Sequence, residues 1–209
     1  MLIVGLTGGV ASGKTTVSKV LREEGATLID ADQIARELVQ PQTLAWQELV
    51  RVFGNEILNR DGSIHRQKLA SLIFSNPRQR SLLNRILHPR IKEEIGRRLK
   101  RIQQKDPDAI VVIDAPLLIE TGGHREMDKV IVVVSTETQQ IDRLRKRNQL
   151  NEGQARAMLS SQMSLEEKTK VADYVIRNEG SLEETRQRAR DLFQELKRIA
   201  LQPKGDKAV

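Results

Sequence analysis

Residues 8–15 have the sequence Gly-Gly-Val-Ala-Ser-Gly-Lys-Thr, a match to G-x-x-x-x-G-K-[ST] that constrains the fold more than any other segment. The apolar run Leu2–Leu6 precedes the match and the helical pattern Thr16–Glu24 follows it, which is the strand–loop–helix context that the pattern needs. In that context the backbone N–H groups of the loop point inward, and the helix N-terminus adds its positive dipole end. The sequence therefore predicts a phosphate-binding loop after the first strand.

The residues of this loop have separate expected tasks. Lys14 is expected to bridge the β- and γ-phosphates of a nucleotide, and the Thr15 hydroxyl is expected to ligate Mg²⁺. The predicted ATP-binding residues in the loop are Gly8, Ala11, Ser12, Gly13, Lys14, Thr15 and Thr16. The alternative is a glycine-rich turn that carries Lys-Thr by chance, and the flanking strand and helix argue against it. Nucleotide binding does not by itself imply phosphoryl transfer, because switches, motors and transporters share the loop.

Short apolar runs, each followed by polar or helical sequence, predict a five-stranded parallel sheet covered by helices, an α/β fold. The runs are Leu2–Leu6, Ala26–Ile29, Ile110–Ile113, Val130–Val134 and Tyr174–Ile176. The long stretch between the second and third runs has no convincing strand and exceeds an ordinary crossover connection. We therefore expect one domain over 1–203. Its core covers about 1–32, 108–140 and 172–200, a helical insertion covers about 33–107, and a tail covers 204–209.

Local signals place several helix boundaries. Ser164 with Glu167 and Ser181 with Glu184 both fit the S-x-x-E capping box, so a helix is expected to start at each serine. Inside the insertion, Pro89 is expected to start or kink a helix.

Two groups of carboxylates are candidates for the chemistry. Asp30 and Asp32 follow the second predicted strand, where open α/β sheets bind their ligands, so one of them could accept a proton from an acceptor hydroxyl. The alternative is that both cap the next helix, and the residues alone leave this choice open. Asp114 ends the third strand and could hold magnesium through water, or it could be a turn residue before Pro116.

A basic cluster follows the fourth predicted strand. Its members are Arg143, Arg145, Lys146, Arg147 and Arg156. Arginines on a mobile lid could close over the phosphates and neutralise the charge that develops during transfer. The alternative for each single residue is a solvated helix face. The three histidines have no metal-ligand spacing, so the sequence does not support a structural metal site.

Composition limits the partners and the compartment. Lys and Arg outnumber Asp and Glu by 35 to 28, a surplus that attracts polyanions, but only 2% of residues are aromatic, which argues against base stacking on nucleic acid. The chain has no cysteine, so disulfides and thiolate chemistry are excluded and a cytoplasmic location is favoured. The apolar runs are too short to cross a membrane, so no membrane association is expected. No obligate protein partner is indicated.

From about Leu2 to about Phe193 the chain resembles the dephospho-coenzyme A kinase family, whose members phosphorylate the ribose 3′-hydroxyl of dephospho-CoA. The matching segments are Gly5–Gly9 leading into the phosphate loop, Ile29–Asp32, Asp61–Ser63 followed by Arg66, His88-Pro89, Asp114–Glu120 and Ala172–Gly180. Their order and spacing carry the resemblance. It implies a P-loop NTPase core, a helical acceptor-binding insertion and a helical lid over about 141–171.

The resemblance also implies roles for particular residues. Asp32 would be the catalytic carboxylate, Lys14 would serve catalysis with it, and Arg147 would reach the ATP phosphates from the lid. The acceptor dephospho-CoA would contact Asp32, Arg66, His88, Pro116, Leu117 and Glu120. Mg²⁺ and ATP are the implied cofactor and co-substrate.

This chain departs from the family pattern at Ala11, where glycine is usual, and at Asn148, where Arg147 is commonly followed by Asp. The alanine should be harmless unless the position requires a positive φ. The asparagine weakens the case for an acidic partner that orients Arg147. Two other functions compete. One is a different P-loop small-molecule or nucleoside monophosphate kinase, and the other is a non-catalytic nucleotide-binding switch. The guanine-specific strings N-K-x-D and D-x-x-G are both missing from the sequence, which counts against the switch.

Overall fold

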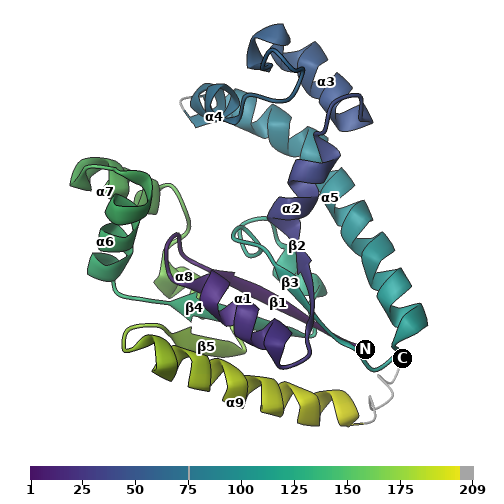
Figure 1. The fold of residues 1–209 in the computed structure, drawn as a ribbon, viewed down its shortest axis with the longest axis vertical. Helices are drawn as coiled ribbons and strands as arrows, with labels where there is room; N and C mark the ends of the chain where they lie inside the picture. Colours follow the sequence, from purple (N-terminus) through teal and green to yellow (C-terminus); the bar gives the residue numbers. More distant parts are fainter. Residues whose placement is uncertain (75, 203–209) are drawn as a thin grey trace. The chain divides into compact units, whose positions relative to one another are not determined.

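The computed structural model describes residues 1–74 and 76–202, and the chain divides into two compact units. The sheet unit comprises Met1–Ile29 and the chain from Ile102 onward, and the helical unit comprises Asp30–Arg101. Figure 1 shows a sheet flanked by helices in the first unit and helices alone in the second. The tail predicted at 204–209 lies outside the described residues.

The sheet unit is built on five strands in the order β2-β3-β1-β4-β5. Their bounds are β1 Leu2–Gly8, β2 Thr27–Asp30, β3 Ile110–Asp114, β4 Lys129–Val134 and β5 Tyr174–Arg177. The pairs β1–β3, β1–β4 and β4–β5 are parallel, so the predicted α/β fold with a five-stranded parallel sheet is confirmed. Because Leu6 pairs with Asp114 and Gly8 with Val133, the phosphate loop leaves β1 at the edge where β3 and β4 also end.

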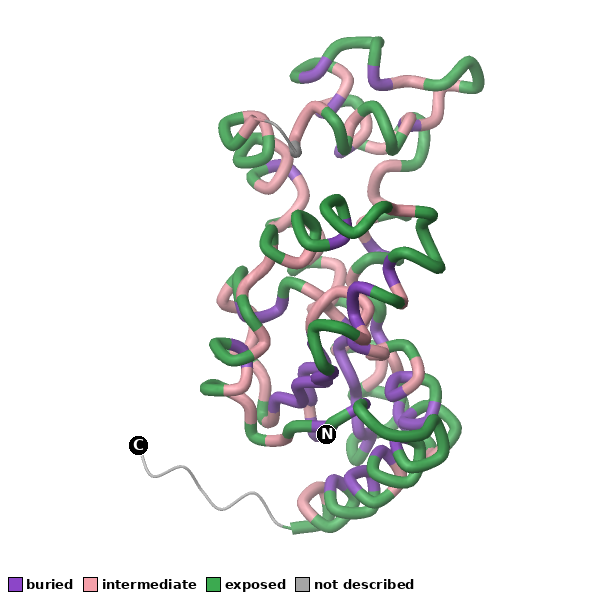
Figure 2. The backbone as a smooth tube through the Cα atoms, turned by 90° about the vertical axis from the view of Figure 1, so that its left-hand side faces the viewer, coloured by how far each residue is buried: buried purple, intermediate pink, exposed green. Residues whose placement is uncertain are grey.

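Helices and loops cover both faces of this sheet. Alternate strand residues such as Val4 and Val133 pack against α1, Lys14–Glu23, and α9, Leu182–Leu201. On the other face, β4 packs against Ile119 and against Leu165 of α8, Leu165–Thr169. Figure 2 shows buried and exposed segments alternating along α9, as expected for a helix with one face on the core. In β4, by contrast, alternate residues point to two covered faces, which explains why its sequence is apolar throughout.

Three further helical segments follow β3 and β4. They are the 3₁₀ turn η2 Gly123–Glu126, α6 Glu137–Asn148 and α7 Glu152–Ser160. Ile141 and Leu144 of α6 form a small core with Ala155 of α7, and Val10 and Ala11 of the phosphate loop pack against it. The base of the segment expected to form the lid therefore rests on the phosphate loop.

Both predicted serine caps are confirmed as helix starts. Ser164 and Glu167 form a complete capping box at α8. Ser181 caps α9 by accepting a hydrogen bond from the backbone N–H of Glu184.

The helical unit has its own core. Its elements are α2 Ala31–Leu38, α3 Leu44–Phe53, the 3₁₀ turn η1 Asn55–Ile57, α4 Arg66–Phe74 and most of α5 Pro77–Lys105. Leu49, Phe53, Ile57, Ile64 and Ile86 form the buried centre of this unit. Among the described residues, no helix is both long and apolar enough to span a membrane.

Of the two expectations for Pro89, a helix start is wrong, because α5 begins at Pro77 and continues through that proline, and a kink there stays a prediction. The packing of Ile86 in the core of the helical unit holds this part of α5 in place. Arg90 also donates a side-chain hydrogen bond to the carbonyl of Ile86, at 2.5 Å. Proline at this position removes the backbone donor that would bond the carbonyl of Arg85, and the packing of Ile86 in the core offsets that cost.

Candidate active site

The phosphate loop contains two left-handed residues that shape it. Gly13, at φ +93° and ψ +18°, precedes α1, and a Cβ atom there would collide with the side-chain amide of Asn178. Glycine is therefore required at this position both by backbone conformation and by space. Ala11 has φ +56°, so it occupies the positive-φ position that would make an alanine costly. Its carbonyl accepts a hydrogen bond from Arg143, at 3.2 Å.

Lys14 and Asp114 are in direct contact. Lys14 lies in the first turn of α1, and its ammonium group donates to the carboxylate of Asp114 at the end of β3. Their side chains are only 17% and 11% exposed, so the ion pair is partly shielded from water. Asp114 is the last residue of β3 and pairs with Leu6 of β1, so it is a strand residue and not a residue of the turn before Pro116. The structure thus joins the candidate phosphate lysine to the candidate magnesium carboxylate.

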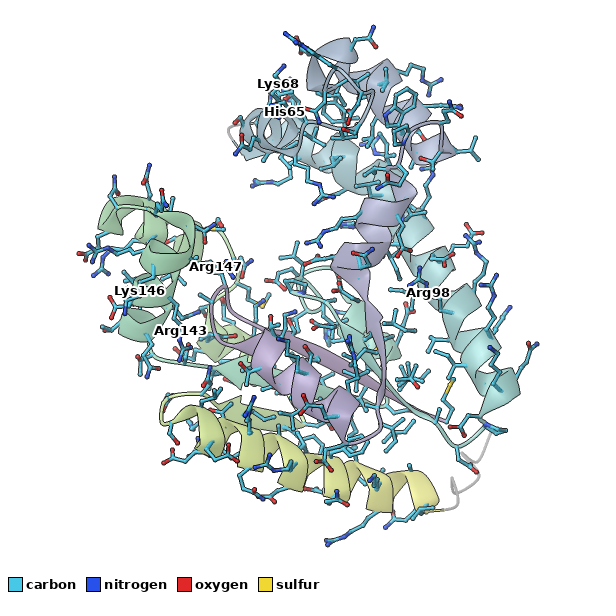
Figure 3. All side chains as sticks on the ribbon, in the orientation of Figure 1. His65, Lys68, Arg98, Arg143, Lys146 and Arg147 are labelled. Atoms are coloured by element: carbon cyan, nitrogen blue, oxygen red, sulfur yellow. The ribbon has the colours of Figure 1, made fainter. Side chains whose placement is uncertain are left out.

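The basic cluster on α6 separates into residues with different surroundings. Arg143 donates to the carbonyls of Ala11 and Asn178, so it braces the phosphate loop. Arg147 donates through Nε to Asn148 Oδ1, at 2.9 Å, so the residue that departs from the family pattern still contacts the arginine. Figure 3 shows Arg143 and Arg147 on the side of α6 toward the phosphate loop, whereas Lys146 lies on the opposite side.

Arg156 forms ion pairs with two carboxylates on the surface. It contacts Glu152 at 2.9 Å and Glu137 at 2.7 Å, and the hydrogen bond that it donates to Glu152 is the main cause that raises the pKa of the arginine. The structure thus ties Arg156 into surface ion pairs.

Sequence reasoning gave no role to the buried amide of Asn178, which supports the phosphate loop from the end of β5. Asn178 Nδ2 donates to the carbonyl of Ser12 at 2.8 Å, and the hydroxyl of Thr185 donates to Asn178 Oδ1 at 2.8 Å. Asn178 is 7% exposed and Thr185 is fully buried. A polar residue directly after an apolar strand was the available signal, because such positions lie at the carboxyl edge of the sheet.

The turn after β3 carries the acceptor candidates of the sheet unit. The Pro116 carbonyl accepts hydrogen bonds from the Thr7 hydroxyl at 3.0 Å and from Lys168 Nζ at 2.9 Å. Glu120 forms an ion pair with Lys168, at 2.8 Å. Leu117 is 43% exposed, so its apolar side chain is open to solvent or to a ligand. The burial of Lys168 could not be predicted from the sequence, since a lysine on a short helix normally faces water.

The remaining candidates belong to the helical unit. Asp30 is the N-cap of α2 and accepts a hydrogen bond from the backbone N–H of Gln33 at 2.9 Å, so the capping interpretation holds for this aspartate. Asp32 lies in the first turn of α2 and is exposed. Arg66 is the first residue of α4 and is exposed, and His88 is half-buried within α5.

A glycine-rich loop between β1 and α1, a lysine paired with a β3 carboxylate and a parallel sheet with β1 at its centre define a P-loop nucleotide-binding protein. The sequence model of the dephospho-CoA kinase family matches residues 2–184. The chain therefore belongs to the dephospho-CoA kinase family, whose members transfer a phosphoryl group from ATP to dephospho-CoA.

Known relatives agree with this assignment. A dephospho-CoA kinase of Bacillus cereus is 46% identical over 185 residues, which cover 88% of this chain and 92% of the relative. A dephospho-CoA kinase structure from Campylobacter jejuni has a TM-score of 0.71 at 26% identity, over 95% of this chain and 98% of that one. A solved Thermus thermophilus protein has a TM-score of 0.80 at 31% identity, over 93% of this chain and 97% of that one.

Proposed function

We propose that this chain phosphorylates the ribose 3′-hydroxyl of dephospho-CoA with Asp32 as the general base. The observation that carries the proposal is the ion pair between Lys14, which follows the phosphate loop, and Asp114, which ends β3. Asp30 ends β2, and two peptide units keep Asp32 within roughly 8 Å of that strand end. The chain therefore offers an exposed carboxylate in the first turn of the helix that follows β2.

In the proposed reaction, Asp32 accepts the proton of the 3′-hydroxyl while the hydroxyl oxygen attacks the γ-phosphorus of ATP. A bond forms between that oxygen and the phosphorus, and the bond from phosphorus to the oxygen that bridges it to the β-phosphate breaks. ADP leaves with the electron pair of the broken bond. The exposure of Asp32 in the first turn of α2 suits a group that must meet a substrate.

The other proposed catalytic residues stabilise charge. Lys14 exchanges part of its contact with Asp114 for the β- and γ-phosphates, and Arg147 approaches the transferred group from α6. The backbone of Gly8, Ala11, Ser12 and Gly13, with the first turn of α1 through Thr16, holds the phosphates.

The oxygen ligands at this edge fit Mg²⁺. Thr15 is exposed in the first turn of α1, and Asp114 supplies a hard carboxylate oxygen beside Lys14. Within the described residues no group of three or more His, Cys, Asp or Glu could hold a metal ion, which suits an ion that arrives largely on nucleotide phosphates. We propose Thr15 as a ligand and Asp114 as a contact through water. When bound, the ion would neutralise charge on the β- and γ-phosphates.

The acceptor contacts are also part of the proposal. Arg66 supplies a cation for the phosphate groups of dephospho-CoA, and His88 supplies a polar contact. The turn at Pro116, Leu117 and Glu120 offers an exposed apolar side chain and a carboxylate. We propose that the reaction takes place in the cytoplasm, as the cysteine-free sequence favours.

Measuring ADP release from Mg·ATP with dephospho-CoA, adenosine, AMP or shikimate tests the acceptor. We expect turnover with dephospho-CoA alone and a product heavier by one phosphoryl group. A 3′-specific nucleotidase should remove that group again. Faster turnover with AMP or shikimate would favour another P-loop kinase, and hydrolysis that needs no acceptor would favour a switch.

A further inference from the structure

Lys168 is a buried cation that the proposed reaction leaves without a task. Its side chain has no exposed surface, although it lies on the five-residue helix α8. Its ammonium group contacts Glu120 Oε1 at 2.8 Å and the Pro116 carbonyl at 2.9 Å. An ammonium group removed from water is costly unless it is paired and hydrogen-bonded, so these contacts are needed to keep the lysine buried.

The Pro116 carbonyl is held from two sides. Thr7, which is fully buried in β1 directly before Gly8, donates its hydroxyl to the same oxygen at 3.0 Å. A carbonyl oxygen has two lone pairs, and here both have a donor. The turn that begins at Pro116 is therefore fixed to the strand that leads into the phosphate loop and to α8.

The helix α8 also touches the phosphate loop itself. A Cβ atom placed on Gly9 would lie 3.1 Å from Leu165 Cδ2, so Gly9 and Leu165 are close neighbours. Leu165 packs in the same cluster as Ile119, which lies within the turn. The short helix α8 thus makes two contacts. With Leu165 it touches the loop that would hold ATP, and with Lys168 it touches the turn that would meet the acceptor.

We propose that Lys168 is a positioning residue for the acceptor, which it serves by holding the Pro116–Glu120 turn in register with the phosphate loop. This inference rests on the assignment of that turn to the acceptor site. Lys168 does not touch the substrate in this account, because its charge is already used within the protein. Its removal releases the turn while the loop contacts of Arg143 and Asn178 stay in place.

Steady-state kinetics of Lys168→Met test the proposal, since Met keeps much of the volume and removes the charge. We expect the KM for dephospho-CoA to rise about tenfold or more, because small misplacements of a substrate site have large effects. We expect the KM for ATP to stay within about twofold, since the phosphate loop keeps its own supports. The matched control is Lys170→Met, the same change on the exposed C-cap of α8, which should leave both KM values unchanged.

Glu120→Gln keeps the proposal testable if Lys168→Met does not fold. This variant should also raise the KM for dephospho-CoA, and the double variant should be no worse than the more impaired single variant, because both changes break one interaction. An unchanged KM for dephospho-CoA in Glu120→Gln, or in folded Lys168→Met, would overturn the role of Lys168. Strictly additive effects in the double variant would overturn it as well. A wild-type protein without turnover of dephospho-CoA would instead overturn the proposed function.

Discussion

The ammonium group of Lys14 is ion-paired with the carboxylate of Asp114, although 100 residues separate the two in the sequence. Parallel pairing of β1 with β3 brings them together, since Asp114 stands opposite Leu6 and Lys14 follows the loop that leaves β1. The pair keeps the lysine at the edge of the sheet, where the phosphates of a nucleotide are expected. Asp114 therefore orients Lys14 in addition to its proposed place beside Mg²⁺.

Asp114→Asn should lower kcat by about a hundredfold and raise the concentration of Mg²⁺ needed for half-maximal rate, because it removes the charge that serves both Lys14 and the metal. Magnesium titrations of the steady-state rate measure both effects. Asp128→Asn is the matched control, since Asp128 precedes β4 at the opposite edge of the sheet and accepts from the backbone N–H of Ile3. If both variants lose activity alike, Asp114 has only a structural role.

Arg147→Met should lower kcat by about a hundredfold or more, because the arginine is proposed to stabilise the charge that develops on the transferred phosphoryl group. The stability of the fold should change little, because the side chain is exposed. Lys146→Met removes a neighbouring charge on the opposite side of α6 and should stay within about twofold of wild type. Single-turnover phosphoryl transfer with both proteins checks this. Equal losses in the two variants would mean that the charge of the lid segment matters, and not the placement of Arg147.

Ala11→Val should lower the free energy of unfolding by about 2 kcal/mol and weaken ATP binding, because a β-branched side chain is strained at a positive φ. Ala11→Gly should stay within about 1 kcal/mol of wild type, since relief of strain offsets the added freedom of the unfolded chain. Urea denaturation of the two variants gives the comparison. A valine variant as stable as wild type would contradict the left-handed conformation at this position.

Tyr174 should titrate at unusually high pH. Burial, together with the hydrogen bond that its hydroxyl donates to Glu195, raises the pKa of the phenol from 10.0 to about 12. Because the pKa of Tyr174 is higher in the folded chain than in the unfolded chain, the protonated phenol stabilises the fold. This contribution is fully present below about pH 10 and is lost as the pH rises toward 12.

The chain has one tyrosine, so ultraviolet absorbance of the phenolate follows this group alone. We expect a midpoint near 12 in the folded protein and near 10 in urea. Tyr174→Phe should remove the corresponding loss of stability in that pH range. A folded-state midpoint near 10 would contradict the burial of the hydroxyl.

The sheet was predictable because strands buried on both faces leave unbroken apolar runs, as in Val130–Val134. The phosphate loop was predictable because its chemistry allows few residue types. Helix boundaries with a local cause, such as the cap at Ser164, were also predictable. The path of α5 through Pro89 was not, because packing of distant residues decides it.

The sequence could not predict which groups the side chains of the site contact. Arg143 and Arg156 look alike in the basic cluster, yet one binds loop carbonyls and the other binds two carboxylates. These differences depend on which backbone groups the fold places within reach. The burial of Lys168 likewise depends on a turn about fifty residues earlier in the chain.

The central claim is that Asp32, and not Asp30, is the general base. The most direct test is the rate of phosphoryl transfer to dephospho-CoA in Asp32→Asn and Asp30→Asn at saturating Mg·ATP, with ATP affinity measured alongside. We predict a loss of about a thousandfold in Asp32→Asn with ATP affinity retained. Asp30→Asn should keep a rate within a few fold of wild type, because asparagine caps a helix as well as aspartate does. A normal rate in Asp32→Asn would contradict the account.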